Sequence, residues 1–195
     1  NLGPDTIKYT LLDDANAMLA AYKSGELQFI EQVPTDEIPN YLASGELQIS
    51  DYIGTYYVCF NTEDEVFSDP NIRKAFSLVI DRNYIVENVS QAGEVPADGY
   101  VPNGVNDAAG AGSDDFRTVG GSYYSISDED YEANCEEARQ LLADAGYPNG
   151  EGFPTVEYLY NTADNHKKIG EALQNMWQTE LGVTVNLNNQ DWNVF

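Results

Sequence analysis

The chain has 195 residues, 42% of them hydrophobic, which is enough for one sizeable domain or two small ones with a packed core. Its 9 basic and 33 acidic side chains give a formal net charge of -24, which argues against nucleic acid or an anionic membrane as a partner, because both attract basic surfaces. No apolar run approaches the length of a membrane span, so we expect no direct membrane insertion by this segment, and we expect a monomer.

The first fifty residues predict two small helical units. Ile7–Leu12 resembles a strand, and Asp13–Asp14 then caps a helix that ends at Ser24–Gly25. Thr35–Glu37 opens a second, shorter helix. The segment Leu47–Asn61 follows, and it reads either as one long bent strand or as two strands joined at Gly54.

The middle of the chain alternates helices with one long irregular segment. Asp69 and Pro70 form a helix start, with Asp69 as the cap and Pro70 at the first helical position. Residues Gly93–Ser127 show little periodicity, which is typical of a segment that covers a binding site or is partly mobile. Asp128–Ala145 predicts an amphipathic helix.

The stretch Thr155–Trp192 predicts a strand, a helix and a second strand. Residues alternate at Val156, Tyr158 and Tyr160, apolar residues then recur at helical spacing until Gly182, and alternation resumes at Val183. Because a connection of this length returns the chain to the same end of a sheet, we expect the two strands to be parallel with a right-handed crossover.

The carboxyl ends of these two strands are the predicted binding edge, because ligands of open α/β sheets sit beyond that edge. The first strand ends at Asn161, and the helix that follows carries the sole histidine, His166, in its first turn. Trp192 lies just past the second strand in a polar setting, which favours a ligand-facing ring over a core position. Trp177 lies on the apolar stripe of the helix and is expected in the core.

The sequence contains no pattern that indicates catalysis, a metal site or a cofactor. His166 is the only base available to a nucleophile, no phosphate-binding glycine loop is present, and the acidic loop at 106–115 lacks the ligand alternation of an EF-hand. Cys59 and Cys135 are expected to be free, buried thiols, although a disulfide between them is left open. Arg73, Asp81 and Arg82 are expected to form an internal ion-pair arrangement.

Several blocks together resemble the extracellular solute-binding proteins of peptide-import ABC transporters, the oligopeptide- and dipeptide-binding family. The match extends over nearly the whole chain, and its order and spacing carry more weight than any single block. The blocks are Gly54–Asn61, Phe67–Phe76, Ile80–Arg82, Ala138–Pro148, Tyr160–Lys168, Leu181–Val183 and Asn189–Trp192.

The resemblance implies an α/β fold with a mixed sheet and flanking helices, part of a bilobal periplasmic-binding-protein-like architecture. Residues 1–54 would belong to the first lobe and lead into the crossing strand, and residues 55–195 would belong to the second, ligand-binding lobe. The chain would then be an interior piece of a longer protein, consistent with a start that is neither a methionine nor a signal peptide.

The resemblance also implies a function and a set of site residues. The full-length protein would be a binding protein and not an enzyme, would capture short peptides without a cofactor, and would deliver them to ABC transporter permease subunits. It would act at the extracellular face of the cell envelope, lipid-anchored or periplasmic. In the oligopeptide branch, the residues matching Asn161, His166 and Trp192 face the peptide, and Tyr57 belongs to a strand that lines the cleft.

The sequence differs from the oligopeptide branch at two positions, and two other functions are compatible with it. Cys59 replaces a glutamate of the branch, and Ser90 stands near a lysine position, so peptide length and charge preference do not follow from the resemblance. One rival keeps the fold but binds another solute, such as a dipeptide, an oligosaccharide or a metal chelate. The other is a surface interaction protein that has no role in transport.

Overall fold

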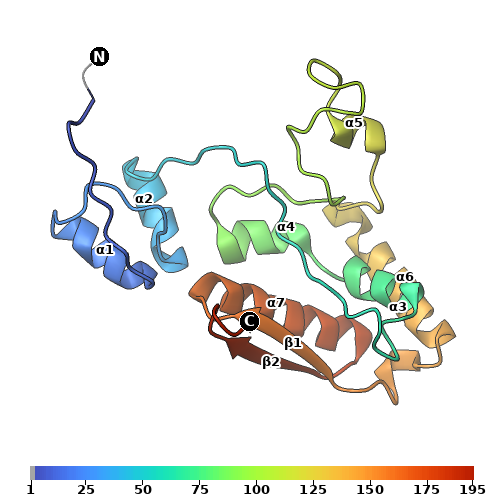
Figure 1. Cartoon of the computed structure of the whole chain (residues 1–195). Helices are drawn as coiled ribbons and strands as arrows, with labels where there is room; N and C mark the ends of the chain where they lie inside the picture. The colour runs from blue at the N-terminus through green and yellow to red at the C-terminus, as the bar shows by residue number, and fades with distance from the viewer. Residues whose placement is uncertain (1–2) are drawn as a thin grey trace. The chain divides into compact units, whose positions relative to one another are not determined.

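The computed structural model describes residues 3–195 and divides the chain into two compact units, one ending at Gln48 and one running from Ile49 to Phe195. Figure 1 labels the helices and strands of both units. Each unit is one continuous stretch of the sequence.

The first unit contains α1 (Ala15–Lys23), the 3-10 turn η1 (Thr35–Glu37) and α2 (Ile38–Ser44). The Asp14 side chain accepts a hydrogen bond from the Ala17 N–H at 2.8 Å, which confirms the predicted cap of α1. Gly45 ends α2 with a φ of 78°, a conformation that glycine adopts without steric cost.

The strands predicted in the first third of the chain are not formed within residues 3–195. Ile7–Leu12 and Leu47–Asn61 run extended but make no ladder, so the structure contradicts both strand predictions. The physical reason is that a strand is defined by its hydrogen-bonded neighbour, and alternating side chains cannot supply one.

The second unit begins with α3 (Pro70–Leu78), whose Asp69 cap accepts from the Asn71 N–H at 2.8 Å, as predicted. The predicted irregular segment Gly93–Ser127 contains only one short helix and an isolated bridge between Asn106 and Asp115. The other elements before the sheet are α4 (Arg82–Tyr84), the π-helical turn η2 (Ile85–Ser90), α5 (Phe116–Gly120), η3 (Asp128–Asp130), α6 (Tyr131–Asp144) and η4 (Pro148–Gly150).

The predicted strand, helix and strand are present as β1 (Val156–Asn161), α7 (Asp164–Leu181) and β2 (Val185–Gln190). The two strands pair in parallel, with Val156 opposite Val185 and Asn161 opposite Gln190. Gly182 ends α7 with a φ of 69°, and an added Cβ there would lie 2.2 Å from the Asn149 carbonyl oxygen. This close approach requires glycine where α7 turns into β2.

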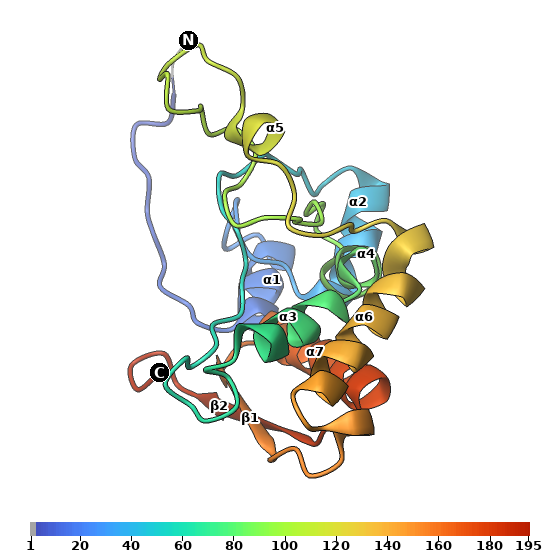
Figure 2. The same cartoon turned by 90° about the vertical axis from the view of Figure 1, so that its right-hand side faces the viewer.

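The core of the second unit lies where α3, α6 and α7 meet beneath the sheet. Figure 2 shows α3 and α6 side by side, with α7 next to them. Trp177 of α7 is only 2% exposed, as predicted, and its indole N–H donates to the Phe76 carbonyl at 2.8 Å. The ring of Phe76 packs at 5.5 Å from that of Trp177, so one buried aromatic contact joins α3 to α7.

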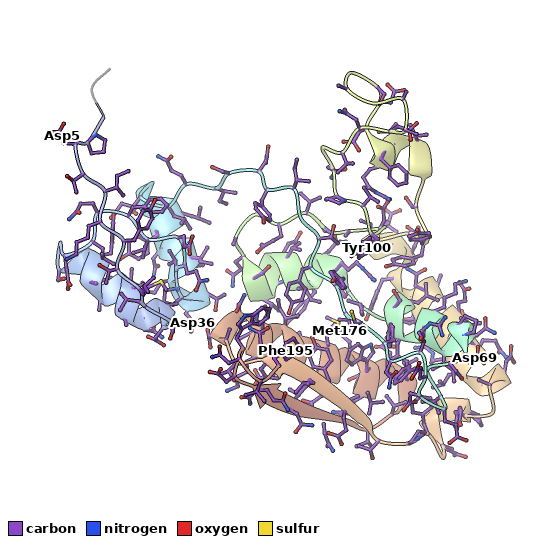
Figure 3. All side chains as sticks on the ribbon, in the orientation of Figure 1. Asp5, Asp36, Asp69, Tyr100, Met176 and Phe195 are labelled. Carbon is purple, nitrogen blue, oxygen red and sulfur yellow. The ribbon has the colours of Figure 1, made fainter. Side chains whose placement is uncertain are left out.

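The structure confirms the α/β class, and within residues 3–195 its sheet consists of the parallel pair β1 and β2. Figure 3 labels Met176, one of the buried residues of α7. None of the helices in residues 3–195 combines the length and the hydropathy that a membrane crossing requires.

The expected ion-pair arrangement of Arg73, Asp81 and Arg82 is wrong. Arg73 and Arg82 form no ion pair with Asp81: their guanidinium groups donate to backbone carbonyls, those of Phe67 and Ser77 among them. Asp81 instead caps α4 by accepting from the Tyr84 N–H. The three side chains thus hydrogen-bond to backbone groups of a loop and of helix ends. The sequence pattern does not reveal such partners.

The two cysteines are free, as expected, but only Cys135 is buried. Cys59 is exposed, because it lies on the outward side of an extended segment whose Val58 and Phe60 turn inward. The expectation of two buried thiols is therefore wrong for Cys59.

Candidate functional site

The carboxyl ends of β1 and β2 and the first turn of α7 lie at the same end of the second unit (Figure 1). The two strand ends are joined by the Thr162 N–H, which donates to the Gln190 carbonyl at 2.8 Å, and by the Thr162 hydroxyl, which donates to Asn189 at 2.8 Å. We call this end the rim. It carries Asn161 at the last position of β1 and His166 in the first turn of α7, as predicted.

His166 is held by a tyrosine from a distant part of the chain. The Tyr56 hydroxyl lies 2.8 Å from Nδ1 of His166, and the two rings stack with centroids 5.5 Å apart and an interplanar angle of 25°. This contact fixes the orientation of the imidazole and leaves Nε2 as its other polar atom. It also attaches the extended segment around Tyr56 to the start of α7.

Desolvation sets the protonation states of this pair. It lowers the pKa of His166 below 6.5, so the imidazole is neutral near pH 7. Desolvation, with a smaller contribution from Tyr158, raises the pKa of Tyr56 well above 10.0, so the phenol keeps its proton. A neutral imidazole next to a protonated phenol can accept or donate at Nδ1, and a phenol that donates there places the imidazole proton on Nε2.

Tyr57 lies next to Tyr56 in sequence but makes a different contact. Its ring meets that of Tyr100 edge-on, with centroids 5.2 Å apart, and a hydrogen bond with Tyr100 raises the pKa of Tyr57. The Thr55 hydroxyl donates to the Tyr100 carbonyl at 2.9 Å and fastens the loop that carries Tyr100, which Figure 3 labels, to the extended segment. The position of Tyr57 is therefore fixed by Tyr100 of the irregular segment and not by residues of the rim.

Trp192 follows β2 and is largely free of its own unit. Its side chain is 72% exposed, and it stacks on Phe195 with centroids 6.0 Å apart and an angle of 19°. Asp191 accepts from the Asn193 N–H at 2.9 Å, which also lowers the pKa of the Asp191 carboxyl and holds the turn that presents the indole. An exposed indole at a strand end can cover an apolar part of a ligand.

The positive charges next to His166 are paired within α7. Lys167 lies 3.8 Å from Glu171, and Lys168 lies 3.2 Å from Asp164. Exposed pairs of this kind contribute little to stability and are screened by salt. The rim therefore offers hydrogen-bond groups and a half-buried neutral imidazole more than a concentrated positive charge.

The structure brings some of the predicted residues together and leaves others apart. Asn161 and His166 share the rim, Trp192 lies two residues beyond Gln190, and Tyr57 packs on Tyr100 instead. Sequence reasoning missed Tyr56, since the pattern could not say which of two adjacent tyrosines faces α7. Within residues 3–195 no group of three or more His, Cys, Asp or Glu side chains could hold a metal ion.

Comparisons with known proteins give a consistent result. The family model of the bacterial extracellular solute-binding proteins, family 5 Middle, matches residues 3–195. The chain is 33% identical over 193 residues to the oligopeptide-binding protein OppA of Bacillus subtilis, covering 97% of this chain and 34% of OppA. It is 34% identical over 192 residues to the dipeptide-binding protein DppE of the same organism, covering 98% of this chain and 33% of DppE.

Solved structures resemble the chain to a similar extent. The crystal structure of Haemophilus influenzae OppA in complex with the peptide RPPGFSPFR matches with a TM-score of 0.77 and 28% identity, covering 93% of this chain and 34% of that one. The murein tripeptide binding protein MppA of Escherichia coli matches with a TM-score of 0.75 and 31% identity, covering 91% and 33%. The chain thus spans about a third of the length of the relatives it matches.

Proposed function

The chain belongs to the family 5 bacterial extracellular solute-binding proteins, and from this premise we propose that the full-length protein captures short peptides and delivers them to the permease of an ABC importer. Solute-binding proteins enclose a ligand and release it without a chemical step, so the family membership assigns a binding role and not an enzymatic one. Hydrogen bonds and hydrated side-chain pockets would hold the peptide.

The observation that carries the proposal is the match of the family model over residues 3–195, together with what the relatives are named for. OppA and DppE of Bacillus subtilis are named as oligopeptide- and dipeptide-binding proteins, and the Haemophilus influenzae OppA structure holds a peptide. The rim places polar side chains at the carboxyl ends of two parallel strands, which is the edge where open α/β sheets bind ligands.

His166 is the proposed contact for a peptide carboxylate. We assign the Tyr56 hydroxyl as the donor to Nδ1, so that Nε2–H of a neutral imidazole points outward as a donor. The positive end of α7, at its amino terminus, adds to the attraction for a carboxylate. Because the pKa of His166 is lowered, the imidazole keeps the same neutral form over a wider range of pH, and this contact with the peptide would not change over that range.

The other site residues take roles that follow from where they lie. Asn161, at the end of β1, offers an amide to the peptide backbone. Trp192, exposed beyond β2, lies against a peptide side chain. Tyr57 contributes from the extended segment, which in this proposal leads from the first lobe, residues 1–54, into the second, residues 55–195.

The location and the partner of the full-length protein follow from the same proposal. Several relatives are named as periplasmic proteins, the OppA proteins of Salmonella typhimurium and Escherichia coli among them. We place the full-length protein at the extracellular face of the cell envelope, lipid-anchored or periplasmic, where it acts as a monomer and meets its permease.

Titration calorimetry on the full-length protein tests the proposal. A mixture of short peptides is expected to give saturable heat, whereas an oligosaccharide or a metal chelate is expected to give none. The absence of heat with every peptide would overturn the proposal, and saturable heat from only the chelate or the sugar would favour another solute for the same fold.

A second titration tests the assignment of His166. Amidation of the peptide carboxyl is expected to weaken binding to the wild-type protein by about tenfold to a hundredfold, the usual strength of a hydrogen bond to a charged group. In the His166→Ala variant the free and the amidated peptide should bind alike. An equal loss on amidation in both proteins would place the carboxylate contact elsewhere.

A further inference from the structure

Tyr56, whose hydroxyl holds His166, has a second polar neighbour in the sheet of the second unit. This neighbour is Tyr158, in the middle of β1. Desolvation raises the pKa of Tyr56 most, and Tyr158 adds to the rise electrostatically and through a hydrogen bond. The Tyr56 hydroxyl also lies 2.8 Å from Nδ1 of His166. The three side chains therefore form one chain of polar contacts that runs from the sheet to the rim.

The ring of Tyr158 is held against the face of α7 that carries His166. Gly170 and Trp177 follow His166 by about one and three helical turns, so the three residues share that face. Tyr158 meets Trp177 edge-on, with ring centroids 5.7 Å apart and an interplanar angle of 62°. A Cβ added at the buried Gly170 would lie 3.2 Å from Cε1 of Tyr158. The missing side chain at Gly170 therefore gives the Tyr158 ring its room on α7.

The direction of the hydrogen bonds along this chain decides which nitrogen of His166 carries a proton. Desolvation raises the pKa of Tyr158 above 10.0, as it does for Tyr56, so each phenol keeps one proton to donate near pH 7. When Tyr56 donates to Nδ1 of His166, its oxygen is left to accept, and the Tyr158 hydroxyl is placed to donate to it. Bonds that all run in one direction polarise and strengthen one another. The Tyr158 hydroxyl thus favours one of the two directions open to Tyr56.

We propose that Tyr158 is a positioning residue for the carboxylate contact of His166. Tyr158 donates to the Tyr56 oxygen, Tyr56 donates to Nδ1, and the imidazole then carries its proton on Nε2, the nitrogen assigned to the peptide. Without the Tyr158 hydroxyl, Tyr56 could equally accept from Nδ1–H, and the lone pair on Nε2 would repel a carboxylate. The contact with the peptide rests on the proposed function, whereas the state of the imidazole is set within residues 3–195 before any peptide binds.

Nitrogen-15 NMR of the histidine rings in the full-length protein, near pH 7 and without peptide, tests the direction of the chain. The His166 signals are identified by their loss in His166→Gln, and they report which ring nitrogen is protonated. The wild-type protein is expected to hold mainly the Nε2–H form. Tyr158→Phe keeps the ring on Trp177 and Gly170 but removes the hydroxyl, so the ratio of the Nδ1–H to the Nε2–H form should rise by about threefold to tenfold, the equivalent of one hydrogen bond.

Two further variants separate positioning from packing. Tyr160→Phe is the matched control, because Tyr160 lies on the same strand with its ring 6.2 Å from that of Tyr158, and it should leave the ratio of the two forms unchanged. If Tyr158 acts through Tyr56, Tyr56→Phe combined with Tyr158→Phe should shift the ratio no further than Tyr56→Phe alone. An unchanged ratio in Tyr158→Phe, an equal shift in Tyr160→Phe, or additive shifts in the double variant would overturn the proposal.

Calorimetry with a free and a carboxyl-amidated peptide extends the test to the peptide contact. The preference for the free carboxyl is expected to fall by about threefold in Tyr158→Phe and to stay unchanged in Tyr160→Phe. A preference that is unchanged in Tyr158→Phe, although the proton has shifted, would overturn the link between Tyr158 and the carboxylate. Failure of the wild-type protein to bind any peptide would contradict the proposed function instead, and the NMR ratio would still decide whether Tyr158 sets the state of His166.

Discussion

Trp177 lies in the core face of α7 and Trp192 lies just beyond the end of β2, at the rim end of the unit, and the two indoles have opposite surroundings. Trp177 is 2% exposed and its N–H is satisfied by the Phe76 carbonyl, whereas Trp192 is 72% exposed and stacks on the ring of Phe195. The core thus uses an indole to complete the fold, whereas the exposed indole beyond β2 is the one that we propose contacts a peptide.

The largest effect should come from truncating the core tryptophan. Trp177→Ala removes a fully buried ring and leaves its cavity, so we expect a loss of about 3–5 kcal/mol in the free energy of unfolding, measured by urea denaturation of the full-length protein. Trp192→Ala is the matched control, with an expected change within about 0.5 kcal/mol. Similar losses of unfolding free energy in both variants would show that Trp192 is as important to the fold as Trp177, and would contradict the comparison.

A smaller effect should come from the turn that connects the core helix to β2. Gly182→Ala combines a positive φ with a Cβ only 2.2 Å from the Asn149 carbonyl oxygen, so we expect a loss of about 2–3 kcal/mol in the free energy of unfolding. Gly146→Ala is the control, since its φ is also positive but nothing lies within 4 Å of its Cβ. That variant should lose only about 1 kcal/mol. Equal losses would show that the close approach of the two turns is not rigid.

At the rim, removal of one hydroxyl should alter binding while leaving stability nearly unchanged. Tyr56→Phe keeps the stacked ring but removes the hydrogen bond to His166 Nδ1, so we expect peptide affinity to fall by about threefold to tenfold in calorimetry, the equivalent of one hydrogen bond. Tyr84→Phe, at an exposed tyrosine of α4 with no proposed role in binding, serves as the control and should leave the affinity unchanged. An unchanged affinity for Tyr56→Phe would mean that the imidazole is not oriented by Tyr56.

The smallest effect is a pH dependence of stability due to His166. Its pKa in the folded chain lies below 6.5, so as pH falls below that value the unfolded chain takes up the proton first and stability decreases until the folded pKa is passed. The imidazole is only half-buried, which keeps the contribution below about 1 kcal/mol. The slope of unfolding free energy between pH 7 and 5 should therefore be slightly shallower in His166→Gln, and a steeper slope would contradict the sign.

The helices of the core could be predicted from local signals in the sequence. Asp69 and Pro70 fix the start of α3, Gly182 fixes the end of α7, and the apolar spacing around Trp177 identifies the buried face, because each depends on neighbours a few residues away. The family resemblance drawn from the sequence blocks is likewise confirmed. Several motifs in a fixed order identify a family even where each motif alone is too short to do so.

Features that depend on distant partners could not be predicted from the sequence. Ile7–Leu12 and Leu47–Asn61 carry strand patterns but pair with nothing in residues 3–195. The choice between Tyr56 and Tyr57 as the neighbour of His166 depends on how an extended segment is rotated against α7, a property of tertiary packing that alternation does not encode. Of the candidate site, the position of His166 in the first turn of α7 followed from the sequence, and the residue that holds it did not.

Fluorescence of the full-length protein during a peptide titration tests the central claim, that the rim meets the peptide and the core does not. We predict a peptide-dependent change in tryptophan emission that is retained in Trp177→Phe and diminished in Trp192→Phe, because, of these two indoles, the exposed one of Trp192 is expected to change its surroundings when the peptide binds. A change that is undiminished in Trp192→Phe and lost in Trp177→Phe would contradict it.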